Sequence, residues 1–305
     1  MRRTALLWRS VVVALLLPVG IAGQGVFRPD TPKEPGARTW LTKKATLPPF
    51  RAPRTRDGVP DLQGNWGAGY SGDVIAETEY VDRTTPPVES WISDPPDGKI
   101  PYQPWALAVR DAHRAGLARG WPGETGQRLY ADPQSFCLEN VPRYSERGFE
   151  LVQTRNFVTM MLGWGHLHRV IPLDGRPKPS EALKTWMGVP RGRWEGETLV
   201  VEVTNINGKM WLDSVGNFYS EHARLTERFR LADANTLDYE LTVDDPTTFT
   251  RPWKANFPLP RVRASDDPYA AEIWEQACHE GNLQHIEGLK SLGFKWYYSP
   301  EPPAR

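Results

Sequence analysis

Two histidines one residue apart, His166 and His168, are the residues of this chain whose spacing points most directly to chemistry. They lie in GWGHLHRVIPLDGRP, residues 163–177, a pattern typical of a strand followed by a turn. In a strand, residues i and i+2 point to the same side, so both imidazoles would share one face. Such a pair offers a metal ion two nitrogen ligands. A third ligand would come from a nearby residue of suitable type: His222, Glu227 or Asp213.

The same two histidines also have interpretations that need no metal. They can bind a ligand or transfer protons by themselves, or they can be hydrogen-bonded residues in the wall of the fold. We expect no cofactor and no bound metal. If a metal is bound, His166 and His168 are its predicted ligands.

Glu227 is a carboxylate on a strand face that is otherwise apolar. In ARLTERFRL, residues 223–231, it alternates with Ala, Leu and Phe, while Arg and Thr occupy the other face. An isolated buried charge costs too much free energy, so this carboxylate must be paired, protonated or hydrogen-bonded. One interpretation is a general base or ligand anchor inside a barrel. The other is a buried ion pair that joins strands, for example with Arg169.

The segment KMWLDSVGNFYSEH, residues 209–222, predicts a loop at one end of the sheet that combines aromatic, acidic and imidazole side chains. Loops on a rigid scaffold often carry function. This set can bind a polyol or supply an acid–base pair. The alternative is a solvated turn with a packed tryptophan. The candidate ligand-binding residues here are Trp211, Asp213, Tyr219 and His222.

The chain contains 13 Trp residues, which suits either a large aromatic core or an aromatic-lined pocket for a flat or sugar-like ligand. We predict Trp164, Trp186 and Trp211 as walls of such a pocket. His166, His168 and Glu227 would be its polar anchors.

Sequence motifs of the large enzyme classes are absent. There is no nucleophile elbow, phosphate-binding loop, dinucleotide fingerprint, HExxH motif or CxxC zinc spacing. The LDGRP and VDDPTTFTRPW segments are typical of turns. We expect Arg176 and Arg251 to form forked bonds to carboxylates such as Asp174 or Asp244.

Alternating apolar residues predict the elements that must position these side chains. Strands are expected over 61–70, 149–162 (two, with a turn at 155–156), 166–172, 192–206 (a hairpin at 195–196), 223–231, 235–245 and 247–257. In the segment 235–245, we expect Leu237, Tyr239, Leu241 and Val243 to point inward. Strands joined by short turns indicate an antiparallel β-barrel or a strongly curved meander.

The remaining segments predict one domain over residues 61–305, with helices near 104–119 and 268–290. Pro104 suits the first turn of a helix, and Gly120 suits its end. Residues 24–60 are rich in Pro, Arg, Lys and Thr, which predicts an extended or mobile arm.

Residues 1–23 have the layout of a secretory signal peptide: early arginines, an apolar run and small residues before the cleavage point. We therefore expect a periplasmic or secreted protein with no membrane span after cleavage. In an oxidising compartment, Cys137 and Cys278 predict one disulfide. Closing so long a loop contributes about 4 to 5 kcal/mol.

The charge balance argues against nucleic acid as a partner. Formal net charge is +0, and loss of residues 1–23 removes three arginines and no acid, which leaves about −3. Nucleic-acid binding requires a clustered basic surface. We expect a monomer whose partner is a small molecule.

Several motifs together resemble a large family of secreted bacterial proteins of unknown function. They are RTRDGVPDLQGNW, IPYQPWA, CLENVPR, RVIPLDGRP, GRWEGETLVVEVTN and ERFRLADANTLDYELTVDDP. The resemblance spans about residues 54–290 and implies a lipocalin-like or related antiparallel barrel. It carries over no catalytic residue.

Three functional hypotheses follow. The first is a small-molecule-binding barrel whose ligand is aromatic or sugar-like. The second is a lyase, isomerase or hydrolase, metal-free or metal-assisted, that uses His166, His168 and Glu227 inside the barrel. The third is a structural or interaction protein of the cell envelope, which predicts a filled barrel and an exposed apolar patch.

Overall fold

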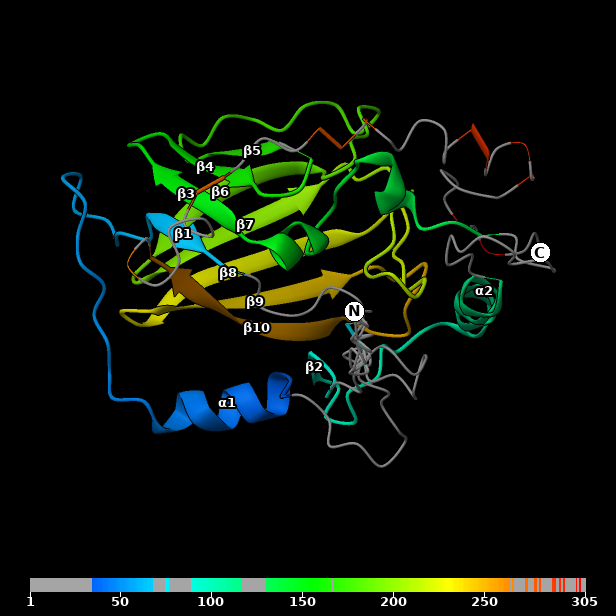
Figure 1. The fold of residues 1–305 in the computed structure, drawn as a ribbon, viewed down its shortest axis with the longest axis horizontal. Coiled ribbons are helices and arrows are strands. Elements are labelled where there is room, and N and C mark those ends of the chain that lie inside the picture. Colours follow the sequence, from blue (N-terminus) through cyan, green and yellow to red (C-terminus); the bar gives the residue numbers. More distant parts are fainter. Residues whose placement is uncertain are drawn as a thin grey trace, which may run out of the picture.

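One antiparallel sheet of ten strands is the frame of the protein (Figure 1). The structure is a computed structural model. It describes residues 35–67, 75–76, 89–116, 130–165 and 167–263, with scattered residues between 265 and 302. The strand order is β5-β4-β3-β1-β10-β9-β8-β7-β6, and β2 pairs with β10. The predicted signal peptide and His166 lie outside the described residues.

The described elements have the following bounds. The strands are β1 (Gly64–Trp66), β2 (Ile92–Asp94), β3 (Phe149–Gln153), β4 (Phe157–Leu162), β5 (His168–Pro172), β6 (Val189–Glu195), β7 (Thr198–Thr204), β8 (Arg224–Asp233), β9 (Thr236–Asp244) and β10 (Trp253–Val262). The helices are α1 (Ala37–Thr46) and α2 (Pro104–Ala115), with short 3-10 helices η1 (Pro133–Phe136) and η2 (Arg143–Arg147).

The alternating sequence pattern explains the strands. Leu237, Tyr239, Leu241 and Val243 of β9 are all fully buried, as predicted, because every second residue of a strand faces the same side. The predicted strand pair within 149–162 and the hairpin within 192–206 are confirmed. The last strand begins at Trp253, later than the predicted 247.

The sheet curls on itself without closing into a barrel. Its two end strands approach each other at Gly192 of β6, where a Cβ atom would lie 2.8 Å from the side chain of Ile171. No backbone ladder joins β5 to β6 in the strand pairing. Between β5 and β6, the side chain of Ile171 thus packs against the backbone of Gly192 where a closed barrel would have backbone hydrogen bonds. Of the two predicted forms, the structure is the strongly curved meander.

Side chains fill the space inside the curved sheet. Fully buried aromatic rings include Trp66, Phe149, Phe229, Tyr239 and Phe257. The rings of Phe229 and Tyr239 stack with centroids 4.6 Å apart. Burial of such rings supplies a large part of the hydrophobic stabilisation.

Helix α1 lies within the segment that we expected to be extended. Its residues Trp40 and Lys44 both contact Asp238 of β9: the indole Nε1 donates to Oδ1 at 2.7 Å and the ammonium pairs with Oδ2 at 2.8 Å. The helix has no side-chain cap and no acidic residue in its first turn. Tertiary contacts therefore account for a helix whose local sequence signals are weak.

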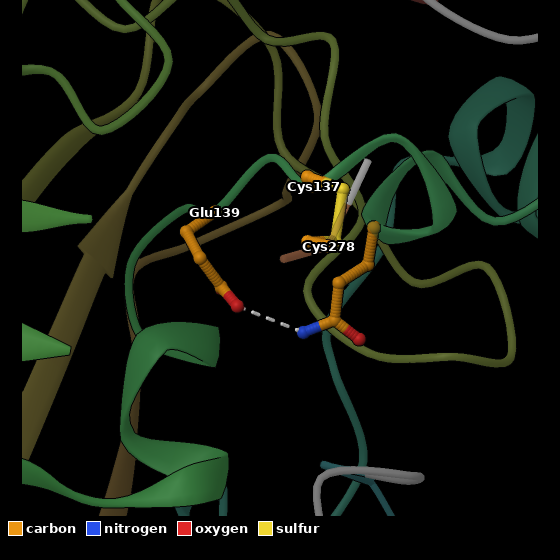
Figure 2. The surroundings of a disulfide bond; sticks show 4 residues. Cys137, Glu139 and Cys278 are labelled. Atoms are coloured by element: carbon orange, nitrogen blue, oxygen red, sulfur yellow. Dashed lines mark hydrogen bonds between the residues drawn. A yellow bond between two sulfur atoms is a disulfide. The ribbon is translucent and has the colours of Figure 1, made fainter. Parts of the chain in front are cut away.

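Helix α2 is confirmed over Pro104–Ala115 and packs through Ala106 against Trp211 and Phe218. Most of the second predicted helix, 268–290, lies outside the described residues. Of its described residues, 272–273, 277–278 and 280 are not helical, whereas 287–288 are. The predicted disulfide joins Cys137 to Cys278, with Cα atoms 5.8 Å apart (Figure 2). Within the described part of the chain, no helix is both long and apolar enough to cross a lipid bilayer.

Candidate functional site

The interior of the curved sheet holds one buried polar cluster, centred on Glu227. Arg169 of β5 donates through both terminal nitrogens to the two carboxylate oxygens, with Nη1 3.0 Å from Oε1. Tyr144 and Tyr239 each donate a hydroxyl to Oε1, at 2.8 and 2.9 Å. Glu227 is 0% exposed and Arg169 is 3% exposed. Glu227 thus faces inward, as predicted, and pairs with Arg169.

This cluster holds its charges in place. Burial alone lowers the pKa of Arg169, but the adjacent Glu227 carboxylate raises it overall, so the guanidinium stays charged. Burial and the same carboxylate raise the pKa of Tyr144 and of Tyr239, which keeps both phenols as donors. A carboxylate that accepts four hydrogen bonds in this way is a structural ion pair.

His168 lies on the outer face of the sheet, away from Glu227. It is exposed, while its neighbour Arg169 is buried. The two cannot both point inward, because successive residues of a strand alternate between faces. The structure therefore does not assemble the expected His168–Glu227 acid–base pair. His166, the other predicted member of the site, lies outside the described residues.

The outer-face surroundings of His168 form a row across four strands. Asn65 of β1 lies opposite Glu150 of β3, Glu150 opposite Met161 of β4, and Met161 opposite His168. Directly opposed residues on one face have Cβ atoms about 5 Å apart. The row therefore places a thioether between a carboxylate and an imidazole.

A groove of about 710 Å³ runs over this row. Besides the row itself, its lining includes Thr159, Leu162 and Leu167. Glu272 and Ile273, from the C-terminal segment, form another part of the wall. Residue 273 lies five positions before Cys278, so the disulfide anchors this segment close to the groove. The groove combines a partly apolar lining with carboxylate, imidazole, hydroxyl and amide groups.

Glu150 and His168 have no hydrogen bond or ion pair from their side chains to any other described residue. The outer face of β6 to β10 is different, since several of its charged side chains pair across strands. The pairs there are Arg193–Glu202 at 2.7 Å, Arg228–Glu195 at 3.0 Å and Lys254–Glu240 at 3.2 Å. Glu150 and His168 are thus available to a ligand, whereas these six charged groups of the opposite half are engaged.

The three predicted wall tryptophans lie in different settings. Trp164 lies in the connection between β4 and β5, and Trp186 lies between β5 and β6; both are half-buried. Trp211 is buried in a separate cluster against α2, where its ring stacks on His113 with centroids 5.0 Å apart. In the structure, Trp211 is a packing residue of this end of the molecule.

The other candidate ligand-binding residues of the 209–222 loop also lie in different surroundings. Asp213 is fully buried and accepts from the backbone nitrogens of Ile75 and Asn217, at 3.0 and 3.1 Å. Burial raises its pKa despite these bonds. Tyr219 is buried and donates to the carbonyl of Val141 at 2.9 Å, while His222 is exposed. Asp213 and Tyr219 therefore hold the loop together.

The predicted turn arginines both bind carboxylates. Arg176 forks onto Asp174, with Nε 2.9 Å from Oδ1, as expected. Arg251 binds Asp94 at 2.7 Å, so the alternative partner Asp244 was wrong. Asp94 belongs to β2, which pairs with β10 although the two strands are far apart in the sequence. No local sequence pattern therefore indicates Asp94 as the partner of Arg251.

Sequence reasoning missed several buried titratable residues, among them His113 and Glu139. His113 of α2 is fully buried, and its ring packs against the rings of Trp211, Phe218 and Tyr130. Its Nδ1 lies 3.0 Å from the carbonyl oxygen of Gly216. Burial lowers its pKa to about 4, although that hydrogen bond acts in the opposite sense. Its place on the apolar side of a helical pattern was the available signal.

Glu139 is another missed residue and lies beside the disulfide (Figure 2). It is 1% exposed; Oε1 accepts from Gln134 Nε2 at 3.0 Å, and Oε2 has no hydrogen-bond partner. Burial raises the pKa of Glu139 to about 7, although the charge of Arg143 acts to lower it. No sequence pattern marks this glutamate, because its burial depends on the fold around CLENVPR.

Among the described residues, no group of three or more His, Cys, Asp or Glu side chains is arranged to hold a metal ion. Comparisons of the chain with models of protein families, with curated proteins and with solved structures found no match. The resemblance to secreted bacterial proteins stays a prediction. Function is therefore inferred from the residues and geometry of this chain.

Proposed function

We propose that this protein binds a small, flat aromatic or sugar-like molecule in the groove on the outer face of β1, β3, β4 and β5. The groove volume of about 710 Å³ falls within the range of small-molecule sites, roughly 300 to 1,000 Å³. The observation that carries the proposal is the unpaired state of Glu150 and His168 on either side of Met161.

The spacing of these residues supports this ligand class. Glu150 and His168 are two strands apart, which separates their Cα atoms by about 10 Å. A ring lying on the Met161 side chain can therefore reach the carboxylate with one hydroxyl and the imidazole with another. Thr159 and Asn65 add further polar groups within the same groove.

The inside of the sheet offers less support for a ligand, since aromatic side chains and the Arg169–Glu227 pair occupy it. Binding on the outer face keeps His168 as a site residue and gives Glu227 a structural role. The wider proposal is a lipocalin-like, periplasmic or secreted monomer.

A panel of simple compounds tests this proposal: glucose, N-acetylglucosamine, phenol and catechol, each added to the full chain and followed by ligand-detected NMR. We expect at least one to bind the wild type. The Glu150→Gln/His168→Gln and Met161→Lys variants should weaken that binding at least tenfold. Asp244→Asn, an exposed change outside the groove, should leave it unchanged. Equal binding to all four proteins, or none to the wild type, would contradict the proposal.

A second candidate function is docking of a second copy of this chain on the same face. Val152, Met161 and Val170 are 37, 36 and 42% exposed and all lie on the outer face of β3, β4 and β5. Clustered exposed apolar side chains are typical of interaction surfaces. Analytical ultracentrifugation of the wild type and of Val170→Lys checks whether this face joins copies of the chain.

A further inference from the structure

A second groove, of about 600 Å³, lies beside α2 and differs in charge from the first. Three cations line it: Lys99, Arg110 and Arg114. Among the described residues that line it, none is a carboxylate. The chain as a whole has equal numbers of basic and acidic residues, so this local excess of positive charge is not a general property of the protein.

Two arginines lie on the same face of α2, an arrangement that does not favour the helix itself. Arg110 and Arg114 are four residues apart on α2, so their side chains share one face, and like charges at this spacing destabilise a helix. Asp111 offsets the charge only in part: one of its oxygens lies 3.0 Å from Arg110 Nε, in a geometry that forms no hydrogen bond. The Arg110 Nε is buried and has no acceptor. The ammonium of Lys99 has no ion-pair partner among the described residues.

The groove next to these cations is built from fixed side chains. Tyr102 lies under the Arg110 guanidinium, whose Cζ is 5.9 Å from the ring centroid. The Tyr102 hydroxyl donates to Asn217 Oδ1 at 3.1 Å, and Asn217 Nδ2 donates to the buried Asp213 at 2.7 Å. These contacts hold Arg110 in position before any ligand binds, which lowers the entropy cost of binding.

An apolar side completes the groove. Ile100 and Leu107 both line it, and Leu107 is one of the few large apolar side chains that are exposed, at 39%. Guanidinium and ammonium groups bind phosphate oxygens through charge-assisted hydrogen bonds. We propose that this groove binds a small organic phosphate, with the phosphate on Lys99 and Arg110 and an apolar group against Leu107.

Titration calorimetry of the full chain tests the proposal with three probes: inorganic phosphate, phenyl phosphate and phenol. We expect phenyl phosphate to bind more tightly than inorganic phosphate, and phenol to bind weakly or not at all. Lys99→Gln and Arg110→Gln should each weaken phenyl phosphate binding at least tenfold. Higher NaCl concentration should weaken it further, because exposed charges are screened.

Matched controls remove one cation elsewhere: Lys209→Gln for the lysine and Arg155→Gln for the arginine, both exposed. These should bind phenyl phosphate as the wild type does. If Arg110→Gln fails to fold because it loses its contact with Tyr102, Lys99→Gln still decides the question. Wild-type binding no tighter than that of Lys99→Gln, or binding lost equally in Lys209→Gln, would overturn the proposal.

Discussion

Arg169 and Glu227 come from strands near opposite ends of the sheet order, and their side chains meet in the interior as a two-pronged ion pair. The pair joins β5 to β8 across the space that the curl of the sheet encloses. Tyr144 and Tyr239 complete the hydrogen bonds of the carboxylate. The curl and the burial of this pair therefore depend on each other.

Replacement of Glu227 by Gln should destabilise the protein strongly. The change leaves the Arg169 charge buried without its partner, and loss of one member of a buried pair costs about 3 to 5 kcal/mol. Urea denaturation followed by tryptophan fluorescence measures the change in unfolding free energy. In the Arg169→Met/Glu227→Leu double variant, both charges of this pair are removed, so we expect part of the loss to be recovered. The single variants Arg169→Met and Glu227→Leu complete the comparison: a double variant as unstable as the sum of these two would show that the charges are not coupled.

Glu139→Gln should remove a pH dependence of stability. Folding raises the pKa of Glu139 from 4.5 to about 7, so the folded protein binds the proton that the unfolded chain releases between these values. The Glu139 contribution to stability is thus full below pH 4.5 and falls as pH rises to about 7, by up to about 3 kcal/mol. Denaturation at several pH values from 4.5 to 8 should show the variant to be less pH-dependent than the wild type and more stable at pH 8. The exposed Glu181→Gln change should behave as wild type.

His113 should make the protein sensitive to acid. Its pKa falls from 6.5 to about 4 on folding, so the unfolded chain binds a proton first as pH is lowered. The contribution of neutral His113 is complete above pH 6.5 and is lost progressively toward pH 4, by up to about 3 kcal/mol. NMR titration of the histidine rings should find His113 neutral at pH 5.5. In His113→Phe, stability should fall less between pH 6.5 and 4 than in wild type. A His113 ring that titrates near 6.5 would contradict the assignment.

Removal of the disulfide should lower stability as a whole. Cys137 and Cys278 are 141 residues apart, and a loop of this length corresponds to about 5 kcal/mol of chain entropy in the unfolded state, of which about 2 to 5 kcal/mol is usually observed. The Cys137→Ala/Cys278→Ala variant is compared with wild type by urea denaturation without reductant. Added reductant should bring the wild type close to the variant and should leave the variant unchanged. A variant as stable as the oxidised wild type would show that the disulfide does not stabilise the protein.

Much of the sheet could be predicted because its signals are local. The period-two pattern gave β3, β4, β7, β8 and β9, and the single cysteine pair gave the disulfide. Helix α1 could not be predicted, since Trp40 and Lys44 are fixed by Asp238, almost 200 residues away in the chain. The open seam between β5 and β6 likewise depends on how Gly192 meets Ile171, which no local pattern encodes.

The candidate site shows a different limit. The sequence is compatible with an inward His168 or an inward Arg169, and strand alternation allows only one of them. The requirement that Glu227 be paired selects Arg169, which places His168 outside. The groove itself could not be predicted, because Glu150 and Met161 meet His168 only through the register of three strands, and Ile273 arrives from a distant segment.

The groove on the outer face owes part of its wall to a covalent bond. Glu272 and Ile273 are tied to the rest of the fold through Cys278, which pairs with a cysteine synthesised long before it. During biosynthesis, the sheet can therefore form while this wall is still a free tail. The wall of the groove is complete only after residues 272–278 have been synthesised and the two thiols have been oxidised, so oxidation would separate a form that lacks this wall from one that has it.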